Sequence, residues 1–304
     1  MAAESGRWPA APEGEWRDTC ATLHMWMQIA GKICLAHTTR TNHFWNIAFH
    51  ITPRGIATPV MTHPGGAFTI TFDLVAHQLL VQRSDGRTST LALEPRSVAD
   101  FYARLAALLR AMGIDVRIWT MPTEVPDPIR FELDTAHHAY DPRVAEALWR
   151  IMLTIKPVFE RFRSGFIGKC SPIHFFWGGF DLAMTRFSGR RAPERPDADS
   201  ITRESYSHEV ISHGFWPGSG PVKEPSFYAY SAPEPAGFKT AVVRPAAAHY
   251  STDFGEYLLP YEAVRASRTP DTDLMAFMRS TYDAAATLAR WDRAELERAP
   301  VGTS

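Results

Sequence analysis

The sequence places its secondary-structure signals in the same order twice. In each half, a predicted helix leads to a Gly-Lys pair, an aromatic segment, further strands and a long amphipathic helix. The matching segments are Gly31-Lys32, His43-Phe44-Trp45 and Arg54 in the first half, and Gly168-Lys169, His174-Phe175-Phe176-Trp177 and Arg186 in the second. This order predicts two similar lobes related by a pseudo-two-fold axis, with a cleft between them. Chance similarity is the alternative, because fourteen residues separate Gly31 from its Trp and only nine separate Gly168 from its own.

Local patterns assign both halves to helices and antiparallel strands. Residues 67–74 alternate apolar and polar side chains, as a half-buried strand does. Asp85-Gly86 lies between two apolar runs, a combination that favours a β-hairpin. Ser97 and Asp141-Pro142 each give a helix-start signal before an apolar stripe at helical spacing. The sequence therefore predicts an α+β fold, in which two pseudo-repeated lobes of antiparallel strands pack with long amphipathic helices.

Further elements follow from the same signals. We expect helices over residues 16–30 and from Thr269 onward, and strands over residues 43–52, 114–119 and 174–185. Two later segments combine aromatic residues with Gly and Pro, which predicts irregular structure with short strands. These segments are residues 204–220 and 225–235.

Proline and acidic residues mark the boundary between the two lobes. Pro122, Pro126 and Pro128 predict an irregular connector. The expected organisation is a first lobe over residues 1–121, a connector over residues 122–140 and a second lobe over residues 141–304. We expect the lobes to pack as one compact unit.

The charge balance limits the partners that the chain is suited to bind. Its 32 basic and 33 acidic residues leave a net charge of −1, so the sequence predicts neither a nucleic-acid nor a membrane partner. It holds no apolar run of about 18 residues, and residues 1–14 lack the apolar core of a secretory signal. Three widely spaced cysteines argue against a disulfide framework. We therefore expect a cytoplasmic protein, whose oligomeric state the sequence leaves open.

Several well-defined motifs are missing. The sequence contains no G-x-G-x-x-G, no G-x-x-x-x-G-K-[ST] and no G-x-S-x-G. These absences disfavour a Rossmann dehydrogenase, a P-loop NTPase and an α/β-hydrolase. The sequence indicates no particular cofactor.

The segment from His174 to Asp181 concentrates the chemistry of the second half. An Asp among apolar residues is costly to bury as a free charge, so Asp181 must be paired, hydrogen-bonded, protonated or bound to a ligand. An ion pair with Lys169, Arg186 or Arg190 is the simplest structural explanation. On one continuous strand His174 and Asp181 would face opposite sides, unless the paired glycines between them introduce a bulge.

A second cluster follows at Tyr206-Ser207-His208-Glu209 and His213. Imidazole and carboxylate groups beside aromatic residues suit general acid–base catalysis or metal ligation. His208 and His213 are five residues apart rather than four, so the H-E-x-x-H zinc motif is excluded. A hydrogen-bonded core histidine is the alternative for each.

We predict one site that combines both clusters. The candidate catalytic residues are His174, Asp181, His208 and Glu209. If a metal is bound, its candidate ligands are His174, His208 and Glu209. The candidate substrate-binding residues are Trp45, Arg54, Trp177, Arg186 and Trp216, because a guanidinium can hold an anion and tryptophans can form the walls. For Arg54, an ion pair at the end of a strand is the alternative.

Five segments resemble the hallmarks of one family. They are W-P-A at 8–10, T-L-H-M-W at 22–26, Q-I-A-G-K at 28–32, H-F-F-W-G-G-F-D-L-A-M-T-R-F-S-G-R at 174–190 and Y-S-H-E-V-I-S-H-G-F-W-P-G at 206–218. Together they resemble an uncharacterised bacterial family, a domain of unknown function about as long as this chain. Where that family more often carries a second Trp, this chain has Phe44. The resemblance covers nearly the whole chain and implies no activity.

Two function classes remain open. In the first, the protein is an enzyme acting on a small polar or anionic molecule. In the second, it binds a small molecule or a protein partner without catalysis, and its polar groups form a satisfied buried network. We favour the enzyme, because several ionisable residues lie among large aromatic side chains in both clusters. A shared site requires His174 or Asp181 to lie within about 5 Å of His208 and Glu209.

Overall fold

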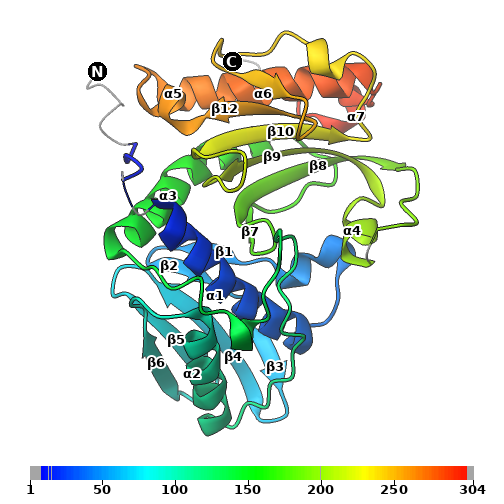
Figure 1. The fold of residues 1–304 in the computed structure, drawn as a ribbon. Coiled ribbons are helices and arrows are strands. Elements are labelled where there is room, and N and C mark those ends of the chain that lie inside the picture. The colour runs from blue at the N-terminus through cyan, green and yellow to red at the C-terminus, as the bar shows by residue number, and fades with distance from the viewer. Residues whose placement is uncertain (1–7, 13, 15, 199, 300–304) are drawn as a thin grey trace, which may run out of the picture.

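Two antiparallel sheets of six strands each form the framework of the computed structural model, which describes residues 8–12, 14, 16–198 and 200–299 (Figure 1). The first sheet has the order β1-β2-β4-β5-β6, with β3 paired to β4. Its strands are β1 (His50–Thr52), β2 (Gly55–Ala57), β3 (Met61–His63), β4 (Gly66–Asp73), β5 (Gln78–Arg83) and β6 (Thr88–Ala92). The second sheet has the order β11-β12-β10-β9-β8-β7. Its strands are β7 (His174–Phe176), β8 (Asp181–Arg191), β9 (His208–Trp216), β10 (Ser226–Ala232), β11 (His249–Ser251) and β12 (Glu256–Pro260).

Helices precede, separate and follow the sheets. The α-helices are α1 (Trp16–His37), α2 (Val98–Ala111), α3 (Pro142–Ser164), α4 (Ser200–Ser205), α5 (Tyr261–Arg265), α6 (Pro270–Leu288) and α7 (Arg293–Leu296). Three short 3-10 helices are η2 (Asn42–Ile47), η3 (Phe131–Leu133) and η4 (Phe238–Thr240). Over the described ranges, no helix is long and apolar enough to cross a lipid bilayer. The predicted α+β fold class is confirmed.

The first sheet packs against α1 and α2 through aromatic side chains. Trp26 of α1 stacks on Phe101 of α2 with ring centroids 4.6 Å apart, and Phe101 in turn stacks on Phe72 of β4 at 6.4 Å. The Ser97 side chain accepts a hydrogen bond from the backbone N–H of Asp100, as the capping signal predicts. These contacts bury one face of the sheet in the core.

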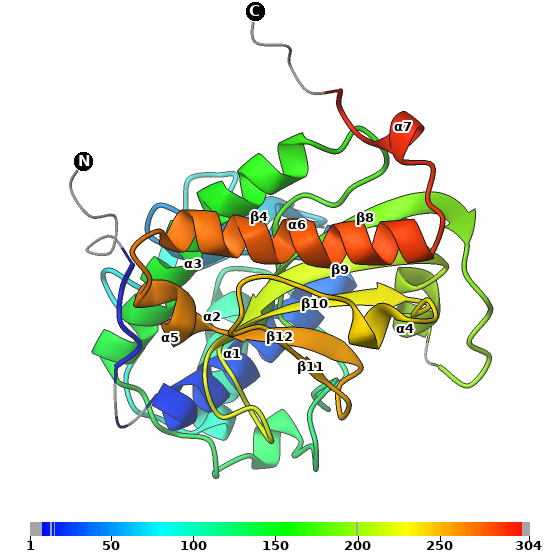
Figure 2. The ribbon, with the colours of Figure 1, turned by 90° about the horizontal axis from the view of Figure 1, so that it is seen from above.

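One face of the second sheet is covered by α3 and α6, which lie across its strands (Figure 2). His213 of β9 contacts α6 through a 3.0 Å hydrogen bond between its Nε2 and Thr281 Oγ1. The guanidinium of Arg186 on β8 lies over the Phe162 ring of α3, 3.6 Å from its centroid. The side chains that alternate along the strands with His213 and Arg186 lie on the opposite face of the sheet.

Two predicted strands take another form. Residues 43–52 were expected to be extended, but His43 and Phe44 have left-handed φ values of 57° and 55° inside η2, and only His50–Thr52 is a strand. Residues 174–185 form a hairpin rather than one strand, because the chain turns at residues 177–180 and Phe180 has a φ of 58°. Residues 114–119 have no regular structure, so that predicted strand is wrong as well.

The two halves of the chain contact each other directly. Phe49 and Phe175 exchange two backbone hydrogen bonds of 2.9 Å. The Trp177 indole donates to the carbonyl of Ile47 and packs on Gly31, where an added Cβ would lie 2.1 Å from the ring. Each half has a long helix before and after six strands, but α4 and η4 interrupt the strands of the second half, and the strand orders of the two sheets differ. The internal repeat and the lobe boundaries therefore stay predictions.

Candidate functional site

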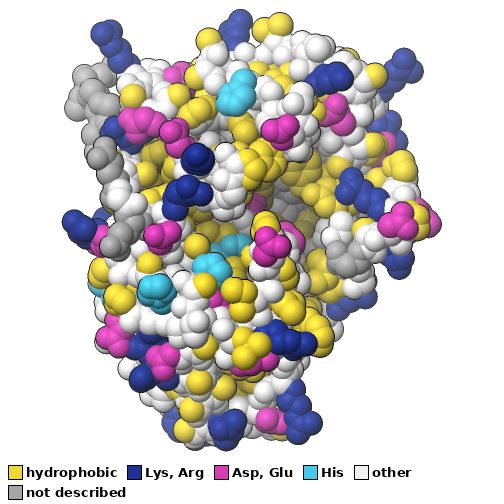
Figure 3. Space-filling view, in the orientation of Figure 1, with side chains coloured by type: hydrophobic (Ala, Val, Ile, Leu, Met, Phe, Trp, Pro, Cys, Tyr) yellow, Lys and Arg dark blue, Asp and Glu magenta, His cyan; other side chains and the backbone are white. Residues whose placement is uncertain are grey.

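The face of the second sheet that points away from α3 and α6 carries aromatic and acidic side chains. Strand register places Asp181 of β8, Tyr228 and Tyr230 of β10, and Glu256 of β12 on this face. Each is partly exposed, and the molecule is hollowed beneath these strands, with hydrophobic side chains on the walls (Figure 3). We call this region the acidic cleft and define it by Glu124, Asp181, Tyr206, Tyr228, Tyr230 and Glu256.

A glycine allows Asp181 to reach its hydrogen-bond partner. The Tyr228 hydroxyl on β10 donates to Asp181 Oδ2 on β8 at 2.5 Å. Strand β9 lies between them, and its Gly214 pairs with both Tyr228 and Ala183. A Cβ at Gly214 would lie 2.3 Å from the Tyr228 ring. Any side chain at position 214 would therefore obstruct the path of the ring across β9.

In the cleft, Asp181 lies beside Glu124, and both Asp181 and Glu256 resist ionisation. A Cβ at Gly179 would lie 2.8 Å from Asp181 Oδ1 and 3.7 Å from Glu124 Oε2, so these two carboxylates are neighbours. Burial raises the pKa of Asp181 to about 7; the Tyr228 hydrogen bond opposes this shift and Glu124 adds to it. Burial, with a smaller contribution from Asp181, raises the pKa of Glu256 to about 7. At neutral pH both groups can therefore give or take a proton.

Three tyrosines extend the cleft toward α4. The rings of Tyr228 and Tyr230 are stacked with centroids 6.0 Å apart. The hydroxyls of Tyr230 and Tyr206 share a hydrogen bond of 2.9 Å. Burial raises the pKa of both Tyr228 and Tyr230, so their hydroxyls stay neutral. The cleft thus offers hydroxyl groups beside flat apolar surfaces.

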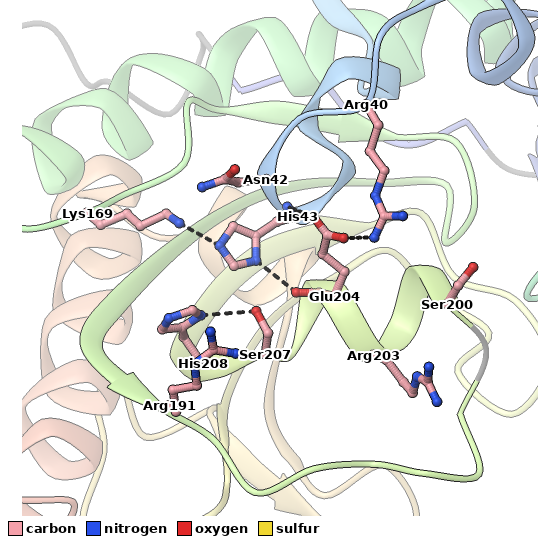
Figure 4. Close-up of a pocket in the computed structure, with 10 residues that line it drawn as sticks. All are labelled: Arg40, Asn42, His43, Lys169, Arg191, Ser200, Arg203, Glu204, Ser207 and His208. Atoms are coloured by element: carbon pink, nitrogen blue, oxygen red, sulfur yellow. Dashed lines mark hydrogen bonds and ion pairs between the residues drawn. The ribbon is translucent and has the colours of Figure 1, made fainter.

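A second hollow lies near the far ends of β8 and β9, and we call it the basic pocket. Its volume is about 480 Å³. The residues that define it are Arg40, His43, Lys169, Arg191, Arg203 and His208 (Figure 4). Among the described residues that line the basic pocket, Glu204 is the acidic one.

The structure does not bring the predicted catalytic residues together. His208 pairs with Arg191 at one end of the β8–β9 ladder, whereas Asp181 begins β8 at the other end, beside Trp216 of β9. Trp216 follows His208 by eight positions along β9, about 26 Å of extended chain. Glu209 forms an ion pair with Arg190, with 2.6 Å between Arg190 Nη2 and Glu209 Oε2. The expected approach within about 5 Å is wrong, because the ladder holds the two clusters apart.

Three predicted substrate-binding residues have structural partners instead. Arg54 Nε donates to Asp73 Oδ2 at 2.7 Å, which is the ion pair considered as the alternative. Arg186 is 3% exposed and contacts α3, on the face away from the cleft. Trp177 is 3% exposed in the contact between the two halves.

The remaining candidates lie around the cleft and the basic pocket. His174 is buried between Trp45 and His50, with ring centroids 6.2 and 5.7 Å away. Burial, then His50 and Arg163, lowers the pKa of His174 to about 4, so it is neutral. Trp45 and Trp216 are partly exposed.

The proposed metal ligands do not converge. His208 and Glu209 lie at the far end of β9, where His208 pairs with Arg191, whereas His174 pairs with Ala183 near the start of β8. Within the described part of the chain, no group of three His, Cys, Asp or Glu side chains is arranged to hold a metal ion.

Sequence reasoning missed Glu124, Tyr228, Tyr230 and Glu256. Tyr228 and Tyr230 are two residues apart, which is the spacing of one strand face. Residues 225–235 were predicted to be irregular structure with short strands, because aromatic residues alternate there with prolines and small residues. Glu124 lies in the expected connector, and no local pattern relates it to Asp181. Only the register of β8, β9, β10 and β12 brings the group together.

Taken together, the two sheets, the acidic cleft and the basic pocket define an α+β protein with two separate polar hollows. The model of a family of unknown function, DUF5996, matches residues 8–298. The chain belongs to that family. A search of the curated proteins and of the solved structures gave no match to this chain.

Proposed function

We propose that the protein is an enzyme that acts on a small polar molecule in the acidic cleft by general acid–base catalysis. The observation that carries this proposal is the pair Asp181 and Glu256, two carboxyl groups on one aromatic sheet face, each with a pKa raised to about 7. Raised carboxyl pKa values of this kind are concentrated at sites that transfer protons near neutral pH.

The surroundings of the pair suggest a role for each residue. Asp181 is the proposed acid or base, and the Tyr228 hydroxyl fixes its orientation through the 2.5 Å hydrogen bond. Glu256 is the proposed second proton-transfer group. Tyr206 and Tyr230 offer hydroxyls to a polar ligand, and their rings can cover its apolar face. The carboxyl groups disfavour an anionic ligand at this point, which narrows the expected substrate to a neutral or cationic polar molecule.

Ligand-observed NMR followed by turnover assays tests the proposal. A panel of small hydroxyl- and amine-bearing molecules is screened against the wild type, Asp181→Asn and Glu256→Gln. We expect at least one ligand that the wild type converts, with kcat falling by about 100-fold or more in Asp181→Asn while binding persists. The rate should depend on an ionisation near pH 7.

The change Asp115→Asn serves as the matched control and should leave the rate unchanged, because Asp115 is exposed and pairs with the exposed Arg117. A ligand that binds the cleft without conversion, equally well in the wild type and Asp181→Asn, would contradict catalysis. That result would favour the non-catalytic binding protein.

We propose a cytoplasmic, bacterial setting on two grounds. Cys20, Cys34 and Cys170 are all unpaired thiols, which a reducing compartment favours. The sequence resemblance is to a bacterial family. Fractionation of the native host cell tests the location.

A further inference from the structure

We propose that the basic pocket binds the phosphate group of a small organic phosphate. The pocket brings together four cationic side chains from four segments of the chain: Arg40, Lys169, Arg191 and Arg203. Like charges repel, so a fold that gathers them around one hollow is stabilised by an anion placed there. This inference concerns a different site from the acidic cleft and does not depend on the proposed catalysis.

Most of this positive charge has no internal counterion. Glu204 forms an ion pair with Arg40, and its Oε1 accepts the backbone N–H of His43 at 3.2 Å. Over the described ranges, neither Lys169, Arg191 nor Arg203 has a carboxylate within ion-pair distance. Three cationic groups therefore remain to hold a ligand with more than one negative charge, such as a phosphate monoester.

The Lys169 ammonium is fixed in place by a neutral histidine. Burial, then Lys169 and His208, lowers the pKa of His43 to about 4. Lys169 Nζ donates to His43 Nε2 at 2.7 Å, which leaves the proton on Nδ1, where it is donated to the carbonyl of Glu204 at 3.0 Å. Figure 4 shows this chain, with Lys169 and Glu204 on opposite sides of the His43 ring. An ammonium has three donors, so two remain for a ligand.

His208 adds a donor that an anion would strengthen. Its Nδ1 shares a 3.0 Å hydrogen bond with Ser207 Oγ. Burial, then Lys169 and Arg191, lowers its pKa, and His43 faces its ring at 5.9 Å. A bound phosphate would offset the repulsion from these cations and favour the protonated imidazole.

The volume of the basic pocket favours an organic phosphate over inorganic phosphate. A volume of about 480 Å³ lies within the usual range of small-molecule pockets, and it leaves room for an organic group beside the phosphate. The partly exposed ring of Trp45 lies beside Lys169, 5.5 Å from its Nζ, at the margin of the pocket.

Isothermal titration calorimetry at low salt tests this inference, with ribose 5-phosphate, inorganic phosphate and ribose as probes. We expect ribose 5-phosphate to bind more tightly than inorganic phosphate, and ribose not to bind. The double change Arg191→Gln and Arg203→Gln should weaken ribose 5-phosphate binding by at least about tenfold, because two charge-assisted hydrogen bonds are lost.

Arg117→Gln is the matched control, since the Arg117 side chain is 91% exposed and pairs with Asp115. Arg117→Gln should bind ribose 5-phosphate with the same affinity as the wild type. Lys169→Gln gives an independent variant with the same expected loss, and thermal melts verify that each variant is folded.

Three results would overturn the proposal. The first is no binding of any phosphate by the wild type, and the second is unchanged affinity in both charge-removing variants. Equal affinity for inorganic and sugar phosphate would refute the organic ligand. A single-stranded oligonucleotide serves as a further probe, and tighter binding of it than of ribose 5-phosphate would reassign the pocket to nucleic acid.

Discussion

At the scale of single residues, the acidic cleft depends on a glycine as much as on its acids. Gly214 leaves the space through which the Tyr228 ring crosses β9 and reaches Asp181. Without this path, the Asp181 carboxyl group would lose the hydrogen bond from the Tyr228 hydroxyl, and the pKa of Asp181 would rise further. Gly214 is thus a positioning residue for Asp181.

The change Gly214→Ala tests this role. The new Cβ would lie 2.3 Å from the Tyr228 ring, so the ring must move and its hydrogen bond to Asp181 must break. We expect unfolding free energy to fall by about 1–3 kcal/mol in urea titrations. Gly165→Ala is the control, because its nearest contact would be an ordinary 3.6 Å and its φ is −76°. Equal stability of the two variants would contradict the packing argument.

The pH dependence of stability gives a second residue-scale prediction. The folded-state pKa of Asp181 is raised from 3.8 to about 7, so its stabilising contribution is complete below about pH 4 and is lost as pH rises through 7. Between pH 4 and pH 8, the wild type should lose on the order of 3 kcal/mol relative to Asp181→Asn. Urea unfolding across this range measures the difference. A constant difference would show that Asp181 ionises as it does in the unfolded chain.

At the scale of elements, the sequence predicted best what depends on local chemistry. The Asp85-Gly86 hairpin, the Ser97 cap and the Asp141-Pro142 helix start are all present, because each signal acts within a few residues. The bend at His43 and Phe44 and the turn before Phe180 were missed. Both require left-handed backbone at non-glycine residues, which tertiary packing imposes and local preference does not reveal. The cleft was missed for a related reason, since strand register assembles it.

The cap of α2 gives an element-scale prediction. Ser97 accepts the backbone N–H of Asp100 at 3.1 Å, so Ser97→Ala should lower the unfolding free energy by about 1 kcal/mol. Ser97→Asp should retain most of the stability, because its carboxylate can accept the same bond. Thermal melts of the two variants provide the comparison. If Ala and Asp destabilise the protein equally, the cap does not stabilise α2.

At the scale of the whole molecule, contacts between the halves indicate one cooperative unit. Trp177 packs on Gly31, and Phe49 pairs with Phe175, so residues of both halves share one core. The acidic cleft also combines Glu124 of the expected connector with Asp181 of the second half. The site therefore requires both halves to be folded.

Equilibrium unfolding tests this cooperativity. We expect far-ultraviolet circular dichroism and tryptophan fluorescence to give one coincident transition in urea. Gly31→Ala should shift both probes together, because its Cβ would lie 2.1 Å from the Trp177 ring. Two separate transitions, of which only one responds to Gly31→Ala, would show that the halves fold independently.

The central claim is that Asp181 is a protonatable acid coupled to a second carboxyl group in the cleft. Carbon-13 NMR titration of the Asp181 carboxyl, assigned with Asp181→Asn, measures its pKa directly. We predict a pKa of about 7 in the wild type and a lower value in Glu124→Gln, where the neighbouring negative charge is removed. A pKa near 3.8, unchanged in Glu124→Gln, would contradict the account.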